Sequence, residues 1–131
     1  MEAGYTLDLT DVAEAVYRRL FNAAEVCLKR GDRTNSKVKQ FRIVDDVLDR
    51  IIPHHPFAPE RALSGSLSGI YRVKKGRLRI CYVADSKLRR ITVLYISDSL
   101  RKHGDSHDPY RVLTKLVRSG KFDALFRRNR D

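Results

Sequence analysis

The chain has little of several features that define common protein classes. It contains only two cysteines, Cys27 and Cys81, and their wide separation excludes a disulfide framework and fits no metal-binding spacing. No apolar run approaches the roughly 18 residues that a membrane span requires. The acidic residues Glu2, Asp8 and Asp11 occupy the region where a secretory signal would be apolar. We therefore expect a cytoplasmic protein that does not bind a membrane.

The common enzyme signatures are missing as well. The sequence has no GxSxG, HExxH, phosphate-binding loop or Rossmann glycine pattern, and no internal repeat. The four histidines fall in expected loops, and the adjacent His54 and His55 tend to diverge rather than bind one ion. We therefore expect no metal and no cofactor, so that any catalysis uses cations together with a tyrosine or a histidine.

Positive charge is what the chain has in excess. Its 131 residues include 27 basic and 16 acidic side chains, which gives a formal charge of +11. The stretch 63–96 holds eight of the basic residues and one acid, Asp85, and so contributes +7 of that total. This concentration indicates a partner that is a nucleic acid, an acidic protein, or both. The length, with 42% apolar and 33% charged residues, predicts one globular domain over 1–131.

Residues 69–97 predict an antiparallel β-meander. Three segments rich in β-branched and aromatic residues, at about 69–74, 77–83 and 90–97, are separated by Gly76 and by a polar turn. Alternation then sorts the side chains of the first two strands onto two faces. The apolar face carries Tyr71, Val73, Leu78, Ile80 and Tyr82. The other face is largely cationic and carries Ile70, Arg72, Lys74, Arg77, Arg79 and Cys81.

The turn between the first two strands sets their register. An even-numbered loop, either Lys75–Gly76 or Lys74–Arg77, keeps the two faces separate and pairs Arg72 with Arg79. Like charges directly opposite one another destabilise a sheet. The cationic face is therefore either a solvated basic surface or a site where a polyanion relieves the repulsion.

Helical periodicity precedes the meander. A short alternating segment over 5–9 could form an edge strand. Apolar residues at helical spacing then predict a helical hairpin over about 11–52, interrupted after Gly31. Asp11 and Ser36 are the expected caps of its two helices, and Pro53 is expected to stop the second one.

A third helix is expected after the meander. Asp108 as cap and Pro109 at the first helical position predict a helix over about 109–119. The fold class is therefore α+β, with an N-terminal helical hairpin packed on a small antiparallel meander and a further helix near the C-terminus.

The basic meander also resembles a known family. The run from Leu63 to Lys74, which reads L-x-G-x-L-x-G-x-Y-R-V-x, is similar to the segment that leads into the central strands of RelE/ParE-type bacterial toxins. The runs Gly76–Tyr82 and Ile91–Ile96 resemble the second and third of those strands. The similarity covers about 60–100. It implies a RelE/ParE-like fold and the toxin of a type II toxin–antitoxin system, with an acidic antitoxin as partner.

The resemblance also implies a reaction. RelE-type toxins are metal-independent endoribonucleases that cut mRNA on the ribosome, where the 2′-hydroxyl of the substrate attacks the adjacent phosphate. Arg72 and Lys74 match catalytic basic positions of that family, and Arg79 matches a phosphate-binding one. Because arginine stays protonated, Lys74 is the expected general base. Tyr110 is the expected general acid, with His103 as an alternative.

Further basic residues are expected to bind RNA, namely Lys75, Arg77, Arg89, Arg90, Arg101 and Lys102. Of these, Arg101 or Lys102 would replace a basic residue of the family at a point where this chain has Ser97–Ser99. That departure leaves two alternatives open. ParE-type relatives share the fold, lack the full nuclease set and act on DNA gyrase. The other alternative is a non-toxic module that binds nucleic acid through the same basic sheet.

Overall fold

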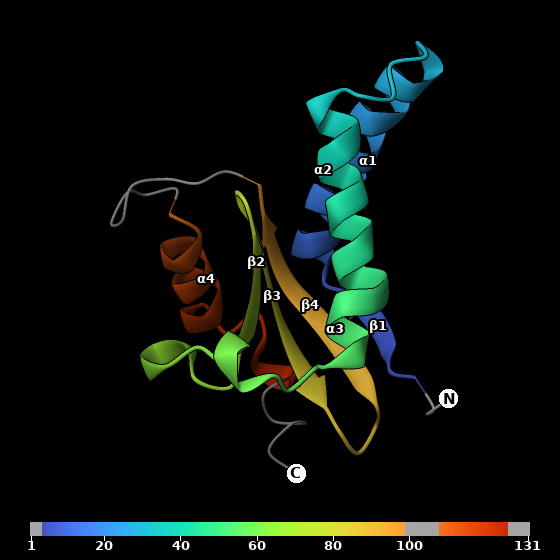
Figure 1. Ribbon diagram of the computed structural model, residues 1–131. Helices are drawn as coiled ribbons and strands as arrows, with labels where there is room; N and C mark the ends of the chain where they lie inside the picture. The colour runs from blue at the N-terminus through green and yellow to red at the C-terminus, as the bar shows by residue number, and fades with distance from the viewer. Residues whose placement is uncertain (1–3, 99–107, 126–131) are drawn as a thin grey trace.

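A computed structural model describes residues 4–98 and 108–125 of the chain. A four-stranded sheet has a pair of long helices against one face and a single helix against the other (Figure 1). The strands are β1 (Thr6–Leu9), β2 (Tyr71–Lys75), β3 (Leu78–Asp85) and β4 (Arg90–Ser97). The helices are α1 (Asp11–Lys29), α2 (Ser36–Asp46), the short α3 (Ile52–His54) and α4 (Pro109–Arg118). The predicted α+β class is confirmed.

The strand order of the sheet is β1-β4-β3-β2. β1, at one edge, pairs parallel to β4, with Thr6 opposite Arg90. The other neighbours are antiparallel, and β2 forms the opposite edge. The two central strands, β3 and β4, consist almost entirely of apolar residues, because both faces of the sheet are covered there.

One hydrophobic core lies between the helical pair and the sheet. Leu20 of α1 and Val44 of α2 pack there against Ile80 and Val93, and all four side chains are buried. The apolar stripe of each helix therefore faces the sheet, as its spacing predicts. Among the described residues, no helix is both long enough and apolar enough to cross a membrane.

The caps of the first two helices lie one residue before the predicted positions. The side-chain oxygen of Thr10 accepts a hydrogen bond from the Ala13 amide, and that of Asn35 accepts one from Lys37. The predicted caps, Asp11 and Ser36, are instead the first helical residues. Both Thr and Asn satisfy free amides at a helix start, so composition alone did not separate neighbouring candidates.

The second helix continues past its predicted stop. A wide π-type turn over Val47–Ile51 follows α2, and α3 carries the helical path through Pro53 to His54. Proline has no amide hydrogen, and in a regular helix its ring would clash with the carbonyl four residues earlier. The wider turn before Pro53 gives that carbonyl room, so the helix ends after the proline rather than before it.

The β2–β3 hairpin has a different register from the predicted one. Lys75 pairs with Leu78, which leaves Gly76 and Arg77 as a two-residue turn. Gly76 has φ +57°, whereas Arg77 is not in the positive-φ region. This is the pattern of a type II′ turn, which places glycine first. The pairing therefore moves by two residues, and the separation of the two faces is kept.

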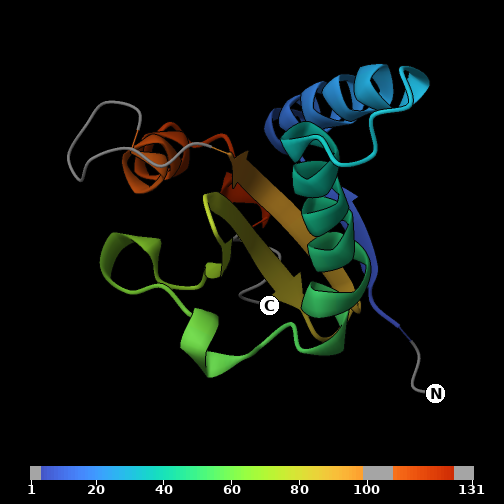
Figure 2. The ribbon, with the colours of Figure 1, turned by 45° about the horizontal axis from the view of Figure 1, so that its top comes forward.

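A second hydrophobic core covers most of the face that was predicted to be cationic. Its buried residues are Ile70, Cys81, Val83 and Leu94 of the sheet region, Leu113 of α4, and Phe122. Figure 2 shows α4 and the α1–α2 pair on opposite sides of the sheet. The expectation of a largely cationic face was wrong, because α4 brings its own apolar stripe against these strands.

A hydrogen bond joins the two long helices. The Tyr17 hydroxyl of α1 donates to Oδ1 of Asp45 in α2 over 2.8 Å. Burial, together with the Asp45 carboxylate, raises the pKa of Tyr17 to about 12. We expect Tyr17→Phe to lower the free energy of unfolding at pH 7 by about 1 kcal/mol, the net contribution of one such bond.

The pH dependence of this effect has a definite sign. A tyrosine whose pKa is raised in the folded state contributes its full stabilisation below the ordinary pKa near 10. This stabilisation is lost as the pH rises through about 12. Urea unfolding of the unaltered protein and of Tyr17→Phe at pH 7 and pH ~11 should therefore show a difference in the free energy of unfolding that becomes smaller at the higher pH. Equal stability at pH 7 would contradict the role of the bond.

Candidate active site on the α4 face of the sheet

Arg72 and Tyr110 form the centre of the candidate site. Nη1 of Arg72, on the edge strand β2, donates to the phenol oxygen of Tyr110 over 2.7 Å. The guanidinium carbon lies 5.9 Å from the centroid of the tyrosine ring. Both side chains are half-buried at the rim of the second core. The fold thus brings together two of the four predicted catalytic residues, 38 positions apart in the chain.

The start of α4 fixes the position of Tyr110. The Asp108 carboxylate accepts a hydrogen bond from the Tyr110 amide over 2.9 Å, which confirms Asp108 as the cap. Pro109 occupies the first helical position, and Leu113, one turn further along, is fully buried in the second core. The cap sets where the helix begins and the buried leucine sets its rotation, so that Tyr110 faces β2.

Lys74 and Arg79 lie opposite each other on β2 and β3. Lys74 is exposed, as a residue that reaches substrate should be. Arg79 is only 5% exposed, and its Nη1 donates to the carbonyl oxygens of Gly76 at 2.7 Å and Leu78 at 3.0 Å. Its guanidinium therefore ties down the hairpin turn, in contrast to the accessible phosphate-binding position that the sequence suggested.

A neutral thiol lies between the cations. Cys81 pairs with Arg72 across the strands and is buried. Burial raises the pKa of the Cys81 thiol to about 12, even though Arg72 and Arg79 act to lower it. Burial therefore favours the thiol over the thiolate that acts as a nucleophile, and Cys81 packs beneath the site as a core residue.

Sequence reasoning did not single out Tyr95 of β4. A β-bulge makes Cys81 pair with Tyr95 while Tyr82 pairs with Val93. Leu94 and Tyr95 consequently both contact the second core, which strict alternation forbids. Burial raises the pKa of Tyr95, although a hydrogen bond with Ser97 lowers it. The bulge has no sequence signal here, so a second phenol near the cations was missed.

The predicted RNA-binding residues do not form one surface. Lys75 lies on the helix-covered face of the sheet, and Arg77 lies in the hairpin turn. At the far end of the sheet, Arg90 pairs with Asp8 at 3.6 Å. The neighbouring Arg89 lies 5.7 Å from the ring centroid of Tyr5.

Three further predictions, Arg101, Lys102 and the alternative acid His103, fall outside the described residues.

The site offers a fixed cation, an amine and a phenol on one face. Because Arg72 donates to the phenol oxygen, the O–H proton of Tyr110 is directed toward another acceptor. Such a phenol can give its proton to a leaving oxygen, and the cation can stabilise charge that develops on a phosphate. In the described ranges, no three His, Cys, Asp or Glu side chains gather closely enough to share a metal ion.

Solved structures with the same arrangement are RelE-type toxins. The RelBE2 toxin–antitoxin complex from Mycobacterium tuberculosis aligns with a TM-score of 0.54 at 14% identity, over 74% of this chain and 93% of that chain. The isolated RelE toxin from E. coli aligns with a TM-score of 0.47 at 17% identity, over 88% of this chain and 97% of that one. The fold is that of the RelE toxins.

The family follows from the sequence match. Residues 11–127 match the YhaV toxin family, described as toxins with endonuclease activity of a toxin–antitoxin system. The match spans most of the chain, and the protein therefore belongs to this family. It is the toxin of a toxin–antitoxin system, with endonuclease activity and a RelE-type fold, which confirms the resemblance seen in the sequence. No curated protein matches the chain significantly.

The buried position of Arg79 changes the effect that its removal should have on stability. Removing a single cation from a repulsive cluster should leave the fold intact. In the structure, however, Arg79→Ala leaves the carbonyls of Gly76 and Leu78 without their donor. We expect the free energy of unfolding to fall by about 2 kcal/mol, as measured by urea denaturation.

Lys74→Ala is the matched control, since it removes an exposed cation directly across the strand pair. It should change stability by less than about 0.5 kcal/mol. If the two variants were equally stable, Arg79 would not hold the turn.

Proposed function

We propose that this toxin cuts mRNA on the ribosome, and that its own side chains carry out the reaction without a metal ion. The observation that supports this is the Arg72–Tyr110 hydrogen bond, with Lys74 exposed on the same face of the same strand. These groups supply a cation, an acid and a base, which is the set that cleavage by an internal hydroxyl requires.

The reaction needs no outside nucleophile. The 2′-oxygen of the RNA forms a bond to the adjacent phosphorus while the bond from phosphorus to the 5′-oxygen breaks. In our proposal, Nζ of Lys74 accepts the 2′-hydroxyl proton and Tyr110 donates its proton to the departing 5′-oxygen. The products are a 2′,3′-cyclic phosphate and a 5′-hydroxyl. Lys74 has then gained a proton and Tyr110 has lost one.

Charge on the phosphate is the main barrier that the protein must lower. As the 2′-oxygen attacks, negative charge builds on the phosphate oxygens, and Arg72 is positioned to stabilise it. Arg79, held by carbonyl oxygens beneath the site, adds fixed positive charge without touching the substrate. We assign it a positioning role, because it fixes the turn next to Lys74.

An acidic antitoxin is the proposed partner. The family is defined within toxin–antitoxin systems, and the RelBE2 structure is itself a toxin–antitoxin complex. A formal charge of +11 on a chain of 131 residues favours a protein of opposite charge, which gains association rate by electrostatic steering.

The first test removes the proposed acid. Tyr110→Phe keeps the ring and removes the proton donor, and we expect mRNA cleavage on purified translating ribosomes to slow by about 100-fold or more. Tyr5→Phe is the control, since Tyr5 lies beside Arg89 at the other end of the sheet.

The termini of the RNA fragments provide an independent readout. Cyclic phosphate ends support attack by the 2′-hydroxyl, whereas 3′-hydroxyl ends would rule out the mechanism. Inhibition of DNA gyrase without any RNA cleavage would exclude the proposed activity altogether.

The second test separates chemistry from binding. Lys74→Ala should lower the single-turnover cleavage rate by about 100-fold while weakening RNA binding by about 10-fold or less, because one exposed charge contributes little affinity. Lys115→Ala, on the exposed side of α4, is the matched control. If rate and affinity fell by the same factor, Lys74 would be a binding residue and not the base.

A further inference from the structure

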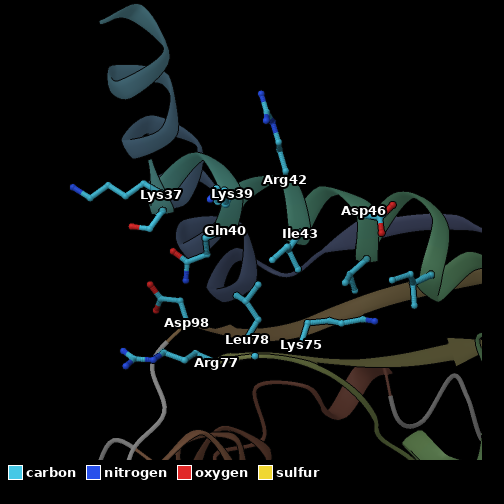
Figure 3. A pocket seen from close by; sticks show the side chains of 14 residues that line it. Lys37, Lys39, Gln40, Arg42, Ile43, Asp46, Lys75, Arg77, Leu78 and Asp98 are labelled. Carbon is cyan, nitrogen blue, oxygen red and sulfur yellow. The ribbon is translucent and has the colours of Figure 1, made fainter. Parts of the chain in front are cut away.

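An open groove runs between α2 and the tip of the β2–β3 hairpin. Its volume is about 1020 Å³, at the upper limit of small-molecule pockets. In Figure 3, Gln40 and Ile43 come from the helix, Lys75 and Leu78 come from the strands below it, and Arg77 comes from the turn between those strands. The groove is thus bounded by a helix on one side and by a β-hairpin on the other.

The groove lies on the opposite side of the sheet from the proposed active site. Lys75 pairs with Leu78, and this pair faces α2, whereas Arg72 and Lys74 alternate to the α4 face. Two basic residues expected from the sequence to bind RNA, Lys75 and Arg77, therefore belong to this groove.

The charges that line the groove are unbalanced. Five lining residues are cationic, namely Lys37, Lys39, Arg42, Lys75 and Arg77. Within the described part of the chain, no carboxylate lies within ion-pair distance of any of these five.

The two acidic lining residues are already neutralised from outside the groove. Asp98 pairs with Arg19 at 3.0 Å, and Asp46 pairs with Arg50 at 2.6 Å. The electrostatic potential in the groove is therefore positive, and it favours an acidic binding partner.

Part of the groove wall is apolar. Ile43 is 41% exposed although it lies in the middle of α2, and Ile51, Val47 and Leu78 continue the apolar strip below it. An exposed isoleucine next to buried aliphatic residues is a place where a partner's apolar side chain would be removed from water.

We infer that the groove binds an acidic, amphipathic segment of a partner protein. Apolar side chains of the segment would cover Ile43, and its carboxylates would meet Lys37, Lys75 and Arg77. This inference rests on the proposed function, because the acidic antitoxin is the partner it assigns to the groove. The inference also places the contact with the antitoxin on the opposite side of the sheet from Arg72 and Tyr110.

Single-stranded RNA fits the groove less well. Proteins that bind RNA strands combine cations with aromatic side chains on which the bases stack, and no aromatic residue lines this groove. The strip around Ile43 would gain nothing from a phosphate backbone. A helix laid along a groove by its apolar side, with charges at the rim, uses both features.

A designed peptide tests the inference directly. The probe is a fluorescein-labelled helix of about 18 residues, roughly 27 Å long, built from Glu, Ala and Leu with leucines on one side. A second peptide has the same composition in scrambled order. We expect the amphipathic peptide to bind the toxin in an anisotropy titration, and to bind more weakly as salt rises.

Two variants locate the contact. Lys37→Glu reverses a rim charge, and Ile43→Gln removes the apolar surface. Each should weaken peptide binding about fivefold or more. Both positions are exposed, and an acid in the first turn of α2 suits the helix dipole, so the fold should survive. Arg33→Glu is the control, an equal charge reversal at an exposed position outside the groove.

The outcomes are separable. Equal binding of the two peptides, no binding, or equal losses in Lys37→Glu and Arg33→Glu would overturn the inference. Binding of single-stranded RNA that depends on Lys37 but not on Ile43 would also overturn it and make the groove a nucleic-acid surface. Cleavage of mRNA by Lys37→Glu should equal that of the unaltered toxin, so the proposed activity stands or falls independently.

Discussion

The pairing of β2 with β3 is the constraint on which the functional surfaces depend. Because successive side chains of a strand point to opposite faces, Arg72 and Lys74 lie on one side of the sheet while Lys75 lies on the other. A slip of one residue would exchange these two sets. The type II′ turn at Gly76, together with the bonds from Arg79 to its carbonyl and to that of Leu78, excludes that slip.

Local patterns predicted much of the fold. Alternation gave the correct face for the paired residues of β2 and β3 even though the register moved by two residues, because parity alone decides the face. It was wrong for Arg77, which was expected on the cationic face and lies in the turn, where it lines the groove beside α2. Apolar spacing gave the stripes of α1 and α2, and the pair Asp108–Pro109 gave the start of α4. These features depend on neighbours within a few residues, which a single sequence displays directly.

The remaining features depend on distant contacts. Arg79 could be recognised as a cation but not as a buried one, since its partners are carbonyl oxygens with no sequence signature. The bulge that turns Tyr95 toward α4 gives no pattern in the strand. The positive charge of the groove became visible only when the structure paired Asp98 with Arg19 and placed no carboxylate of residues 4–98 or 108–125 within ion-pair distance of Lys75.

The connectivity also bears on how the toxin is made. β1 and β4 pair in parallel although Thr6 and Arg90 stand far apart in the chain, so the sheet closes only after most of it has been synthesised. Tyr110 comes later still, in α4. A nascent chain that ends before α4 therefore contains Arg72 and Lys74 but not the phenol to which Arg72 donates in the folded protein.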